Sequence, residues 1–409
     1  MIDIRNLRHN PEIYKQSAQA RNIKVDIDRI LQHDQRRLEL LGKVEELRSK
    51  LNVKGKPTHD ELEHLQKNKK ELDPLEKELA ELEHSLNESL SLIPNILADG
   101  TPEGGEEDNR QEKTWGDSKQ PGFEIKDHVE LAESQGWLDF ERGAKVAGSK
   151  FYFLKGSAVR LEMAVIKMAM DLIEKEGFTL VSVPHLANSR TMNGTGYNPR
   201  GDEQQIYEIK DEDLNLIATA EIPLTGYHAD EIIDPEELPI LYVGYSPSYR
   251  REAGAYGKYS KGLYRVHQFN KLEMYVFCKA DESEKWHQKL VEIEEQICQL
   301  LEIPYRLVRI AAGDLGAPAY KKFDVEYWSP VENQYRELMS CSNVTDYQSR
   351  RLNIRTRAED GKPELVHTLN GTAVAFSRVF IALLENHQDA DGNVHLPEAL
   401  HKYYGGGVL

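Results

Sequence analysis

The sequence predicts an α+β protein in which an antiparallel helical hairpin precedes a mixed, mainly antiparallel sheet flanked by helices. Leucines recur at helical spacing early in the chain, and strand-like runs mix with helical ones from there to the C-terminus. No Gly-x-Gly-x-x-Gly follows a strand-like run and no Gly-x-x-x-x-Gly-Lys-Ser/Thr occurs, so neither a Rossmann dinucleotide site nor a P-loop is predicted. A length of 409 residues suits two domains.

The helical hairpin is predicted from two apolar seams. The first has steps of four, three and four, through Leu40, Val44, Leu47 and Leu51. The second alternates steps of three and four, through Leu62, Leu65, Lys69, Leu72, Leu75, Leu79, Leu82 and Leu86. Such seams are typical of two antiparallel helices in coiled-coil contact. At about 1.5 Å per residue, a first helix over 27–51 would be roughly 38 Å long.

Breaker residues divide and interrupt this hairpin. The stretch 52–57 contains Gly and Pro, and Thr58 followed by Glu61 offers a capping box for the return helix. Pro74 is predicted to kink that helix or to restart it, with Asp73 as the N-cap. Taken alone, a heptad stretch of this kind favours a packing or dimerisation coiled coil.

The second domain follows a stretch with linker composition, the Gly- and Glu-rich residues 100–107. We therefore predict an N-terminal domain over 1–110, with its hairpin over about 27–93, and a second domain over 111–409. In the second domain, strand-like runs cover 151–154, 241–243 and 272–277, and the clearest helices cover 159–176 and 281–301.

The net charge of −17 is unexpected for a protein that binds nucleic acid. The charge is unevenly distributed, however. Residues 36–70 contain ten Lys/Arg against six Asp/Glu, a local charge of +4, whereas 71–112 contain two against thirteen, a local charge of −11. One stretch of the arm is thus positive, which permits RNA binding without requiring it.

Features of secreted or membrane proteins are missing from the sequence. Residues 1–8 already contain Asp3, Arg5 and Arg8, and no run approaches the 18 apolar residues of a membrane span. The three cysteines are widely spaced, which argues against a disulfide framework or a zinc site. We expect a cytoplasmic protein with no membrane partner.

Polar residues gather in four short segments of the second domain. They are Arg250-Arg251-Glu252 with the following strand to Glu273, Thr219-Ala220-Glu221, Glu337 to Asn343, and Thr368 through Arg378. An arginine beside a glutamate suits a nucleotide site, because one grips phosphate and the other accepts from an adenine amino group. Each segment alone reads more simply as a surface hairpin, a helix cap or a turn.

Together and in this order the segments resemble the class II aminoacyl-tRNA synthetases. Residues 177–184, 250–273 and 367–386 resemble the three class-defining motifs, the first of which forms a dimer interface. The stretches 219–224, 340–351 and 383–386 resemble the serine-specific members, so the chain is identified as a member of the seryl-tRNA synthetase family. That resemblance implies a class II fold, a homodimer, and ATP-dependent transfer of L-serine to tRNA(Ser), and to tRNA(Sec) where it is present.

The resemblance also implies residue roles. Arg250 would hold the ATP α-phosphate, and Arg250 and Arg378 would act in catalysis. The ATP-binding set would be Arg250, Arg251, Glu252, Val266, Phe269, Glu337, Leu338, Met339, Ser340 and Arg378. Within it, Phe269 and Arg378 would sandwich the adenine, and Glu337 and Ser340 would ligate Mg²⁺. The serine-binding set would be Thr219, Ala220, Glu221, Glu273 and Thr372. No general base for the transfer step is apparent.

The hairpin would then be an arm that reads tRNA by shape rather than a packing coiled coil, and DNA would not be a partner. Its expected phosphate contacts are Arg36, Arg37, Lys43, Arg48 and Lys50.

Some positions depart from the family pattern. Thr372 stands where many members have Ser, Ala373 and Ser377 replace glycines, Met339 replaces a small polar residue, and the arm is short and contains Pro74. A carrier-protein ligase would lack the arm, and a structural paralogue would lose the charged site residues. A threonine or proline enzyme would be expected to carry a C-terminal anticodon domain, whereas the chain ends 23 residues after Asn386.

Overall fold

The computed structural model describes residues 2–52, 58–118, 120, 122–197, 205–252 and 261–409. The chain divides into two compact units, Met1–Ile96 and Leu97–Leu409.

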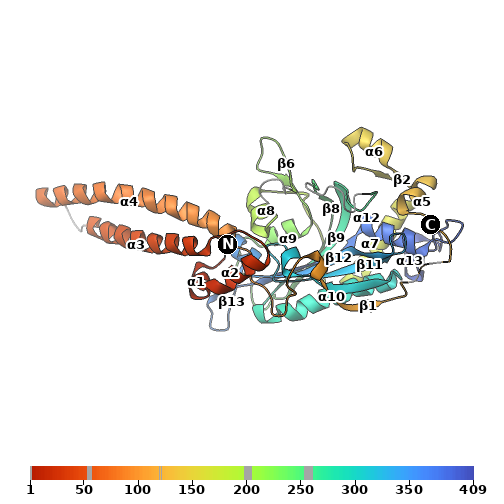
Figure 1. Cartoon of the computed structure of the whole chain (residues 1–409). Coiled ribbons are helices and arrows are strands. Elements are labelled where there is room, and N and C mark those ends of the chain that lie inside the picture. The colour runs from red at the N-terminus through yellow and green to blue at the C-terminus, as the bar shows by residue number, and fades with distance from the viewer. Residues whose placement is uncertain (1, 53–57, 119, 121, 198–204, 253–260) are drawn as a thin grey trace. The chain divides into compact units, whose positions relative to one another are not determined.

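The first unit is helical (Figure 1). Its helices are α1 (Ile4–His9), α2 (Pro11–Ala20), α3 (Ile27–Leu51) and α4 (His59–Ser91). The two long helices pack through the predicted seams, with Leu40, Val44, Leu72 and Leu79 buried between them. Lys69, on the same seam, is exposed. The predicted hairpin is therefore present, although residues 53–57 of its loop and the Glu61 side chain of its capping box lie outside the described residues.

Pro74 does not restart the return helix, so the restart, one of the two effects predicted for it, is wrong. α4 is continuous from His59 to Ser91 with Pro74 inside it. A proline removes one backbone hydrogen bond and crowds the preceding turn, at a cost of about 3 kcal/mol. Leu72 and Leu79 are buried against α3 on either side of it. Packing on both sides therefore holds the helix together through the proline.

The second unit is built on one eight-stranded sheet with the order β1-β10-β11-β12-β15-β9-β8-β4. All neighbours are antiparallel except β4 and β8, which are parallel. The strands are β1 (Arg110–Trp115), β4 (Thr179–Ser182), β8 (Ile240–Tyr249), β9 (Gln268–Cys278), β10 (Tyr305–Arg309), β11 (Lys321–Ser329), β12 (Gln334–Thr345) and β15 (His367–Ala375). The mixed, mainly antiparallel sheet is confirmed.

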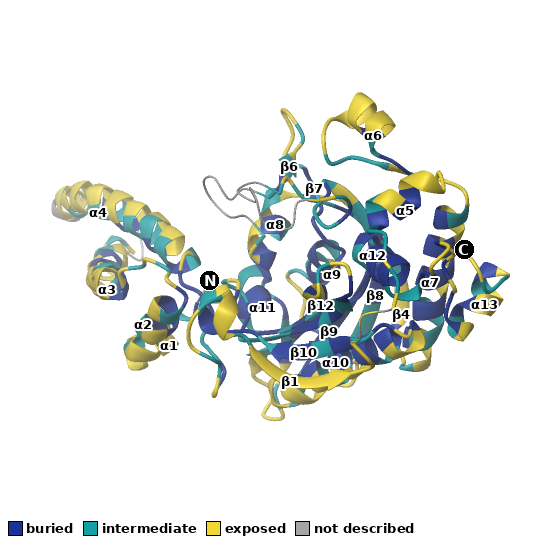
Figure 2. Ribbon diagram, turned by 45° about the vertical axis from the view of Figure 1, so that its right-hand side comes forward, coloured by how far each residue is buried: buried dark blue, intermediate teal, exposed yellow. Residues whose placement is uncertain are grey.

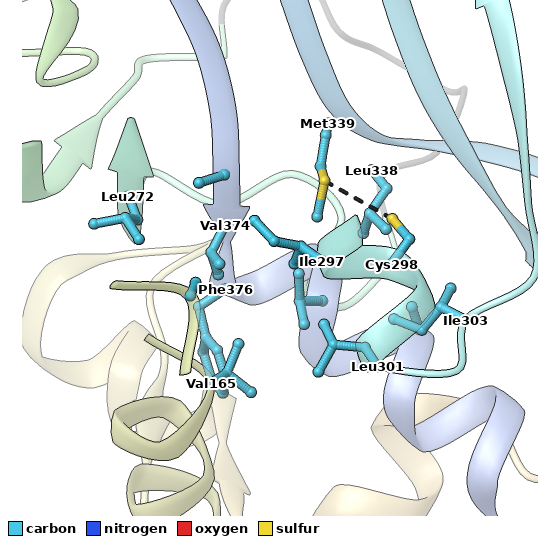
Figure 3. Close-up of a cluster of buried hydrophobic side chains, with 14 of the residues drawn as sticks. Val165, Leu272, Ile297, Cys298, Leu301, Ile303, Leu338, Met339, Val374 and Phe376 are labelled. Carbon is cyan, nitrogen blue, oxygen red and sulfur yellow. Dashed lines mark hydrogen bonds between the residues drawn. The ribbon is translucent and has the colours of Figure 1, made fainter. Parts of the chain in front are cut away.

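Helices cover both faces of this sheet (Figure 2). α7 (Ser157–Lys175), α10 (Ser283–Leu300) and α12 (Phe376–His387) share one large core with the sheet, part of which is shown in Figure 3. On β9, Leu272, Met274 and Val276 point into that core, whereas Tyr275 and Phe277 belong to a second core on the opposite face. Because side chains alternate along a strand, Phe269, Lys271 and Glu273 share the face of Tyr275.

Other sequence predictions are refined by the structure. The runs 241–243 and 272–277 lie within β8 and β9, and the two predicted helices match α7 and α10 within two residues at each end. Of 151–154, only Phe153–Leu154 forms a strand, β3, and it pairs with the two-residue β2 (Leu138–Asp139) outside the main sheet.

The predicted linker 100–107 is attached to the second unit. Ala312 N donates to Pro102 O at 2.9 Å and Gly313 N to Gly104 O at 2.8 Å, and β1 follows as a strand of the sheet. The compact units consequently divide between Ile96 and Leu97, before the boundary that composition suggested. Within the described part of the chain, no helix has the length and apolar character needed to cross a membrane.

Candidate active site

Strand register brings the polar segments together. Thr372 on β15 pairs with Glu273 on β9, Phe269 on β9 pairs with Ser248 near the end of β8, and Ser340 on β12 pairs with Asp324 on β11. Thr372 and Glu273, which are 99 positions apart in sequence, thus lie side by side on adjacent strands.

The first part of the site is formed by the end of β8 and the start of β9. The Arg250 guanidinium lies over the Phe269 ring, 5.3 Å from its centroid, and its Nε is buried with no hydrogen-bond partner among the described residues. The Glu252 carboxylate accepts from Arg265 Nη1 at 2.9 Å. Its backbone has a φ of 49°, which is uncommon for a residue other than glycine and is typical of a constrained functional position.

Two further predicted residues differ in accessibility. Val266 is buried, whereas Arg251 is exposed and its backbone N donates to Gln205 O at 2.9 Å. Val266 can therefore contact a nucleotide only from the protein interior, and Arg251 can contact it only from the solvent side.

A β-bulge aligns the second part of the site. Glu337 and Ser340 are three residues apart, so regular alternation would place them on opposite faces of β12. Register instead jumps from Val325↔Met339 to Glu326↔Glu337, so Leu338 is an extra residue in β12. This bulge brings Glu337 onto the face of Ser340.

Charges around Glu337 are tightly coupled. Its Oε1 lies 2.7 Å from Arg378 Nη1. Although its surroundings desolvate it, the positive charges of Arg378 and Lys322 lower the pKa of Glu337 to about 2. Asp324, beside it, is buried; burial raises the pKa of this carboxyl to about 7 against the opposing charge of Lys322, 3.1 Å away. Glu337 is therefore the anion that remains ionised across the neutral range.

The oxygen atoms at this position fit a magnesium ion that is shared with phosphates. Carboxylate and hydroxyl oxygens from Glu337 and Ser340 are hard donors, and buried Asp324 Oδ1 has no hydrogen-bond partner among the described residues. Within that same part of the chain, no cluster of three or more His, Cys, Asp or Glu could hold a metal by itself. Mg²⁺ commonly takes only one or two carboxylates and completes its shell with substrate phosphates and water.

Leu338 and Met339 do not present side chains to the site. Both are buried in the large core, where Met339 Sδ accepts from Cys298 Sγ at 3.9 Å (Figure 3). Only their backbone atoms are available to a nucleotide. The methionine that replaces a small polar residue at 339 therefore packs in the core and does not change the side chains of the site.

The third part of the site is a buried cluster of polar side chains. Glu273 Oε2 lies 2.5 Å from Lys271 Nζ and accepts from Thr372 Oγ1 at 3.4 Å. Lys271 Nζ also reaches Thr219 Oγ1 at 3.4 Å. Thr219, Lys271, Glu273 and Thr372 are all buried. A small polar ligand that entered here would have to match these groups closely, because each would otherwise be left unpaired.

Glu221 is a further buried carboxylate close to this cluster. Its Oε1 accepts from Gln348 Nε2 at 2.7 Å and from Asn370 Nδ2 at 3.0 Å. Burial raises the pKa of Glu221 to about 7, the negative charge of Glu273 adds to the shift, and the hydrogen bond from Gln348 opposes it. Ala220, next to it, is fully buried and contributes only packing.

Sequence reasoning did not single out several residues that the structure places in the site. They are Arg265, Lys271, Lys322, Asp324, Gln348 and Asn370. Strand alternation could have indicated Lys271, because it lies between Phe269 and Glu273 on one face of β9. Gln348 lies in the stretch 340–351 that resembles the serine-specific members, but no spacing indicates that it reaches Glu221 from a separate helix, α11 (Tyr347–Leu352).

The basic residues of the arm are largely paired with its own carboxylates. Arg36 lies 2.7 Å from Glu78, Arg48 lies 2.7 Å from Glu76, Arg37 lies 3.0 Å from Asp34, and Lys50 lies 2.5 Å from Glu46. Lys43 is exposed. Three of these pairs are solvent-exposed and contribute little stability, whereas Asp34, the partner of Arg37, is buried.

Comparison with known proteins covers both units. A seryl-tRNA synthetase N-terminal domain model matches residues 1–97, and a class II tRNA synthetase core domain model (G, H, P, S and T) matches 206–387. A serine–tRNA ligase of Dictyoglomus turgidum is 48% identical over 99% of this chain and 98% of its own, and one of Rubrobacter xylanophilus is 47% identical over 100% and 99%.

Two solved structures share the fold. The seryl-tRNA synthetase of Pyrococcus horikoshii, in complex with ATP, matches with a TM-score of 0.93 and 40% identity over 100% of this chain and 99% of that one. The cytoplasmic serine–tRNA ligase of Naegleria fowleri, in complex with AMP, matches with a TM-score of 0.87 and 32% identity over 98% and 95%. The chain therefore belongs to the seryl-tRNA synthetase family of class II aminoacyl-tRNA synthetases.

Proposed function

We propose that the second unit activates L-serine with ATP as seryl-adenylate and that the helical arm of the first holds the tRNA that receives it, in the cytoplasm. Serine activation and tRNA charging follow from family membership. The observation that supports this division of the site is the buried polar cluster of Thr219, Lys271, Glu273 and Thr372, of which Lys271 and Glu273 lie on the same strand as the Phe269 ring that Arg250 covers.

Serine would be recognised through both of its polar ends. Its ammonium group would meet Glu221 and Thr219, and its hydroxyl would meet Glu273 and Thr372. Thr372 keeps the hydroxyl that the more common serine at this position would supply. Alanine and glycine lack the side-chain hydroxyl and would leave Glu273 with one buried partner fewer.

ATP would bind over Phe269, with Arg378 on the other side of the adenine and Glu252 and Val266 along its edge. Arg250 would hold the α-phosphate, which suits its buried, unpartnered Nε. Glu337 and Ser340 would hold Mg²⁺, which would supply positive charge to the phosphates when bound. The serine carboxylate would attack the α-phosphorus in line, pyrophosphate would leave, and Arg250 would stabilise the charge that develops.

Pyrophosphate exchange with serine, threonine, alanine and glycine in parallel tests this proposal. We expect exchange with serine to exceed exchange with alanine and with glycine by at least about a hundredfold, because a site built around a hydroxyl discriminates strongly against analogues that lack it. Threonine keeps the hydroxyl and tests whether the site excludes the additional methyl group. Absence of serine-dependent exchange would refute it.

A pH dependence should follow from Glu221. Its pKa of about 7 means that it is half protonated near neutrality in the free enzyme. Only the ionised form pairs with the serine ammonium group, so KM for serine should rise roughly tenfold for each unit that the pH falls below about 7. Glu221→Gln should weaken serine binding and remove this dependence. Measurement of KM for serine between pH 5.5 and 8.5 checks it, and a flat wild-type profile contradicts the role.

A homodimer is proposed for the same family reason. β4, which resembles the first class-defining motif, ends the strand order of the sheet and carries exposed Leu180, and α7 exposes Val159 and Met163. An edge strand and apolar side chains of this kind are normally covered. Sedimentation equilibrium at micromolar concentration should give twice the chain mass, and a monomer mass would overturn the proposal.

A further inference from the structure

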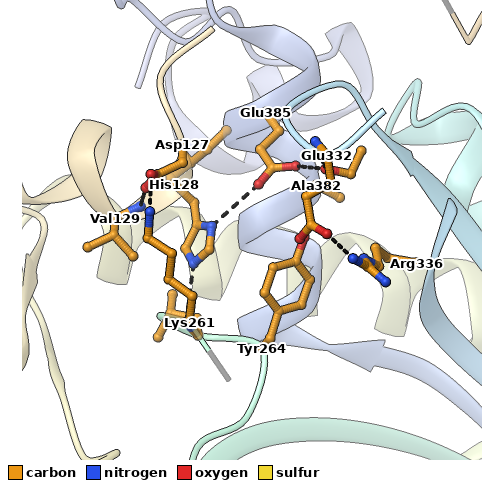
Figure 4. A network of polar contacts seen from close by, with 12 residues as sticks. Asp127, His128, Val129, Lys261, Tyr264, Glu332, Arg336, Ala382 and Glu385 are labelled. Carbon is orange, nitrogen blue, oxygen red and sulfur yellow. Dashed lines mark hydrogen bonds and ion pairs between the residues drawn. The ribbon is translucent and has the colours of Figure 1, made fainter. Parts of the chain in front are cut away.

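A second buried polar cluster lies beside the nucleotide-binding residues and has no role in the function described so far (Figure 4). At its centre is His128, 2% exposed, at the first position of α5 (His128–Ser134). Its Nδ1 lies 3.4 Å from Glu385 Oε1 on α12, and Glu385 Oε2 accepts from Ser329 Oγ at 2.6 Å. Glu385 is thus fixed to β11 on one side and to the imidazole on the other.

The other nitrogen of His128 holds the backbone that leads into β9. Leu263 N donates to His128 Nε2 at 3.2 Å. Nε2 must therefore carry a lone pair, so the ring proton is on Nδ1, where it donates to Glu385. A Cβ at Gly262, where φ is +61°, would lie 2.2 Å from Nε2, so only glycine lets the backbone approach the ring this closely.

Neighbouring contacts hold the same segment. Asp127 caps α5 through Val129 N at 2.9 Å, and its second oxygen lies 2.5 Å from Lys261 Nζ. The Tyr264 ring stands edge-on to His128 with 5.4 Å between ring centroids. Residues 261–264 are thereby held by two consecutive residues, Asp127 and His128.

The segment leads directly to the adenine side of the site. Arg265, two residues after Leu263, is the residue that bonds Glu252, and Val266 follows it. Arg378, which pairs with Glu337, lies on the same helix as Glu385. The helix α12 therefore carries Arg378, which reaches the site, and also Glu385, which through His128 holds the backbone that leads into β9.

We propose that His128 is a positioning residue of the nucleotide site: it connects Glu385 to Leu263 and so holds Arg265 against Glu252. This inference rests on the function proposed above. It adds His128 and Glu385 as residues that act through others rather than by touching ATP.

Two substitutions at His128 test its two hydrogen bonds, to Glu385 and to Leu263 N, separately. The amide of His128→Gln reaches the position of Nε2 and can accept from Leu263 N. The shorter His128→Asn keeps a donor near Glu385 but leaves Leu263 N without an acceptor. An unpaired buried N–H is costly, so we expect His128→Asn to raise KM for ATP about tenfold and His128→Gln to restore most of the loss. KM for serine should stay within about twofold of wild type, because Thr219, Glu221, Glu273 and Thr372 are held by other elements.

His387→Asn is the matched control. His387 lies on the same helix, and its Nε2 donates to Leu301 O at 2.9 Å, away from the nucleotide residues. This variant should lower the melting temperature without raising KM for ATP. Pyrophosphate exchange gives both KM values, and calorimetric titration with ATP gives its affinity without turnover.

Three outcomes would overturn the positioning role: equal effects of Asn and Gln at 128, a parallel rise of KM for serine, or the same loss of ATP affinity in His387→Asn. If the wild type shows no serine-dependent exchange but binds ATP, the proposed function fails while the calorimetric comparison still decides the role of His128. A wild type that does not bind ATP would overturn both.

Discussion

Deletion of the helical arm, residues 27–93, should abolish tRNA charging and leave serine-dependent pyrophosphate exchange close to its original rate. Every residue proposed for serine activation lies in the unit Leu97–Leu409, whereas the proposed tRNA contacts lie on α3. Loss of several phosphate contacts weakens nucleic-acid binding by on the order of a thousandfold, and we expect kcat/KM for tRNA to fall by at least that much. Both activities should be measured on the same preparation.

A pair of charge reversals provides a control for this deletion. Lys43 and Lys77 are both exposed lysines of the arm, but Lys43 lies in the basic stretch 36–70 and Lys77 in the acidic stretch 71–112. Lys43→Glu should raise KM for tRNA several-fold and make binding less dependent on salt, and Lys77→Glu should change neither. Equal loss of exchange and charging on arm deletion would show instead that the arm is a structural element.

Glu273→Ala should remove the preference for serine over alanine. A site that hydrogen-bonds a substrate hydroxyl rejects the analogue without it by about 10⁴-fold, and truncation of Glu273 should reduce that ratio by a thousandfold or more. The variant also leaves Lys271, 6% exposed, without its partner at 2.5 Å. A buried unpaired charge costs about 3–5 kcal/mol, so a lower free energy of unfolding should accompany the loss of specificity.

Two further variants separate specificity from stability at this position. Lys271→Met combined with Glu273→Ala removes the unpaired charge, so stability should recover while the preference for serine stays lost. Glu273→Gln keeps an acceptor and should keep part of the preference. Exchange rates with serine and alanine, together with urea unfolding, distinguish these results. A variant Glu273→Ala that still prefers serine as strongly as wild type would rule out Glu273 as the group that reads the hydroxyl.

The arm illustrates how local pattern can determine structure. The leucine spacing defines the seam, and α3 spans the residues that the pattern predicted. The predicted restart at Pro74 is wrong for the opposite reason: the cost of the proline is local, but burial of Leu72 and Leu79 against a second helix outweighs it. Helix propensity is a property of one segment, whereas packing also depends on the residues of the helix that lies against that segment.

Residues 100–107 show the same limit for linkers. Their composition is that of a flexible connection, yet their carbonyls accept from Ala312 and Gly313, about two hundred residues later in the chain. Composition does not indicate a backbone hydrogen bond to a short 3₁₀ helix so far along the chain.

By itself, the sequence predicted the two-part architecture, the antiparallel character of the sheet and, through its motifs, Arg250, Glu273, Glu337 and Arg378 as the charged groups of the candidate site. Only the tertiary structure decided how those groups are paired. The bulge at Leu338 turns Glu337 toward Ser340, and strand pairing places Thr372 opposite Glu273. Gln348 and His128 reach their partners from separate helices. Such pairings depend on register and on long-range packing, which are properties of two segments at once and leave no periodic trace in either.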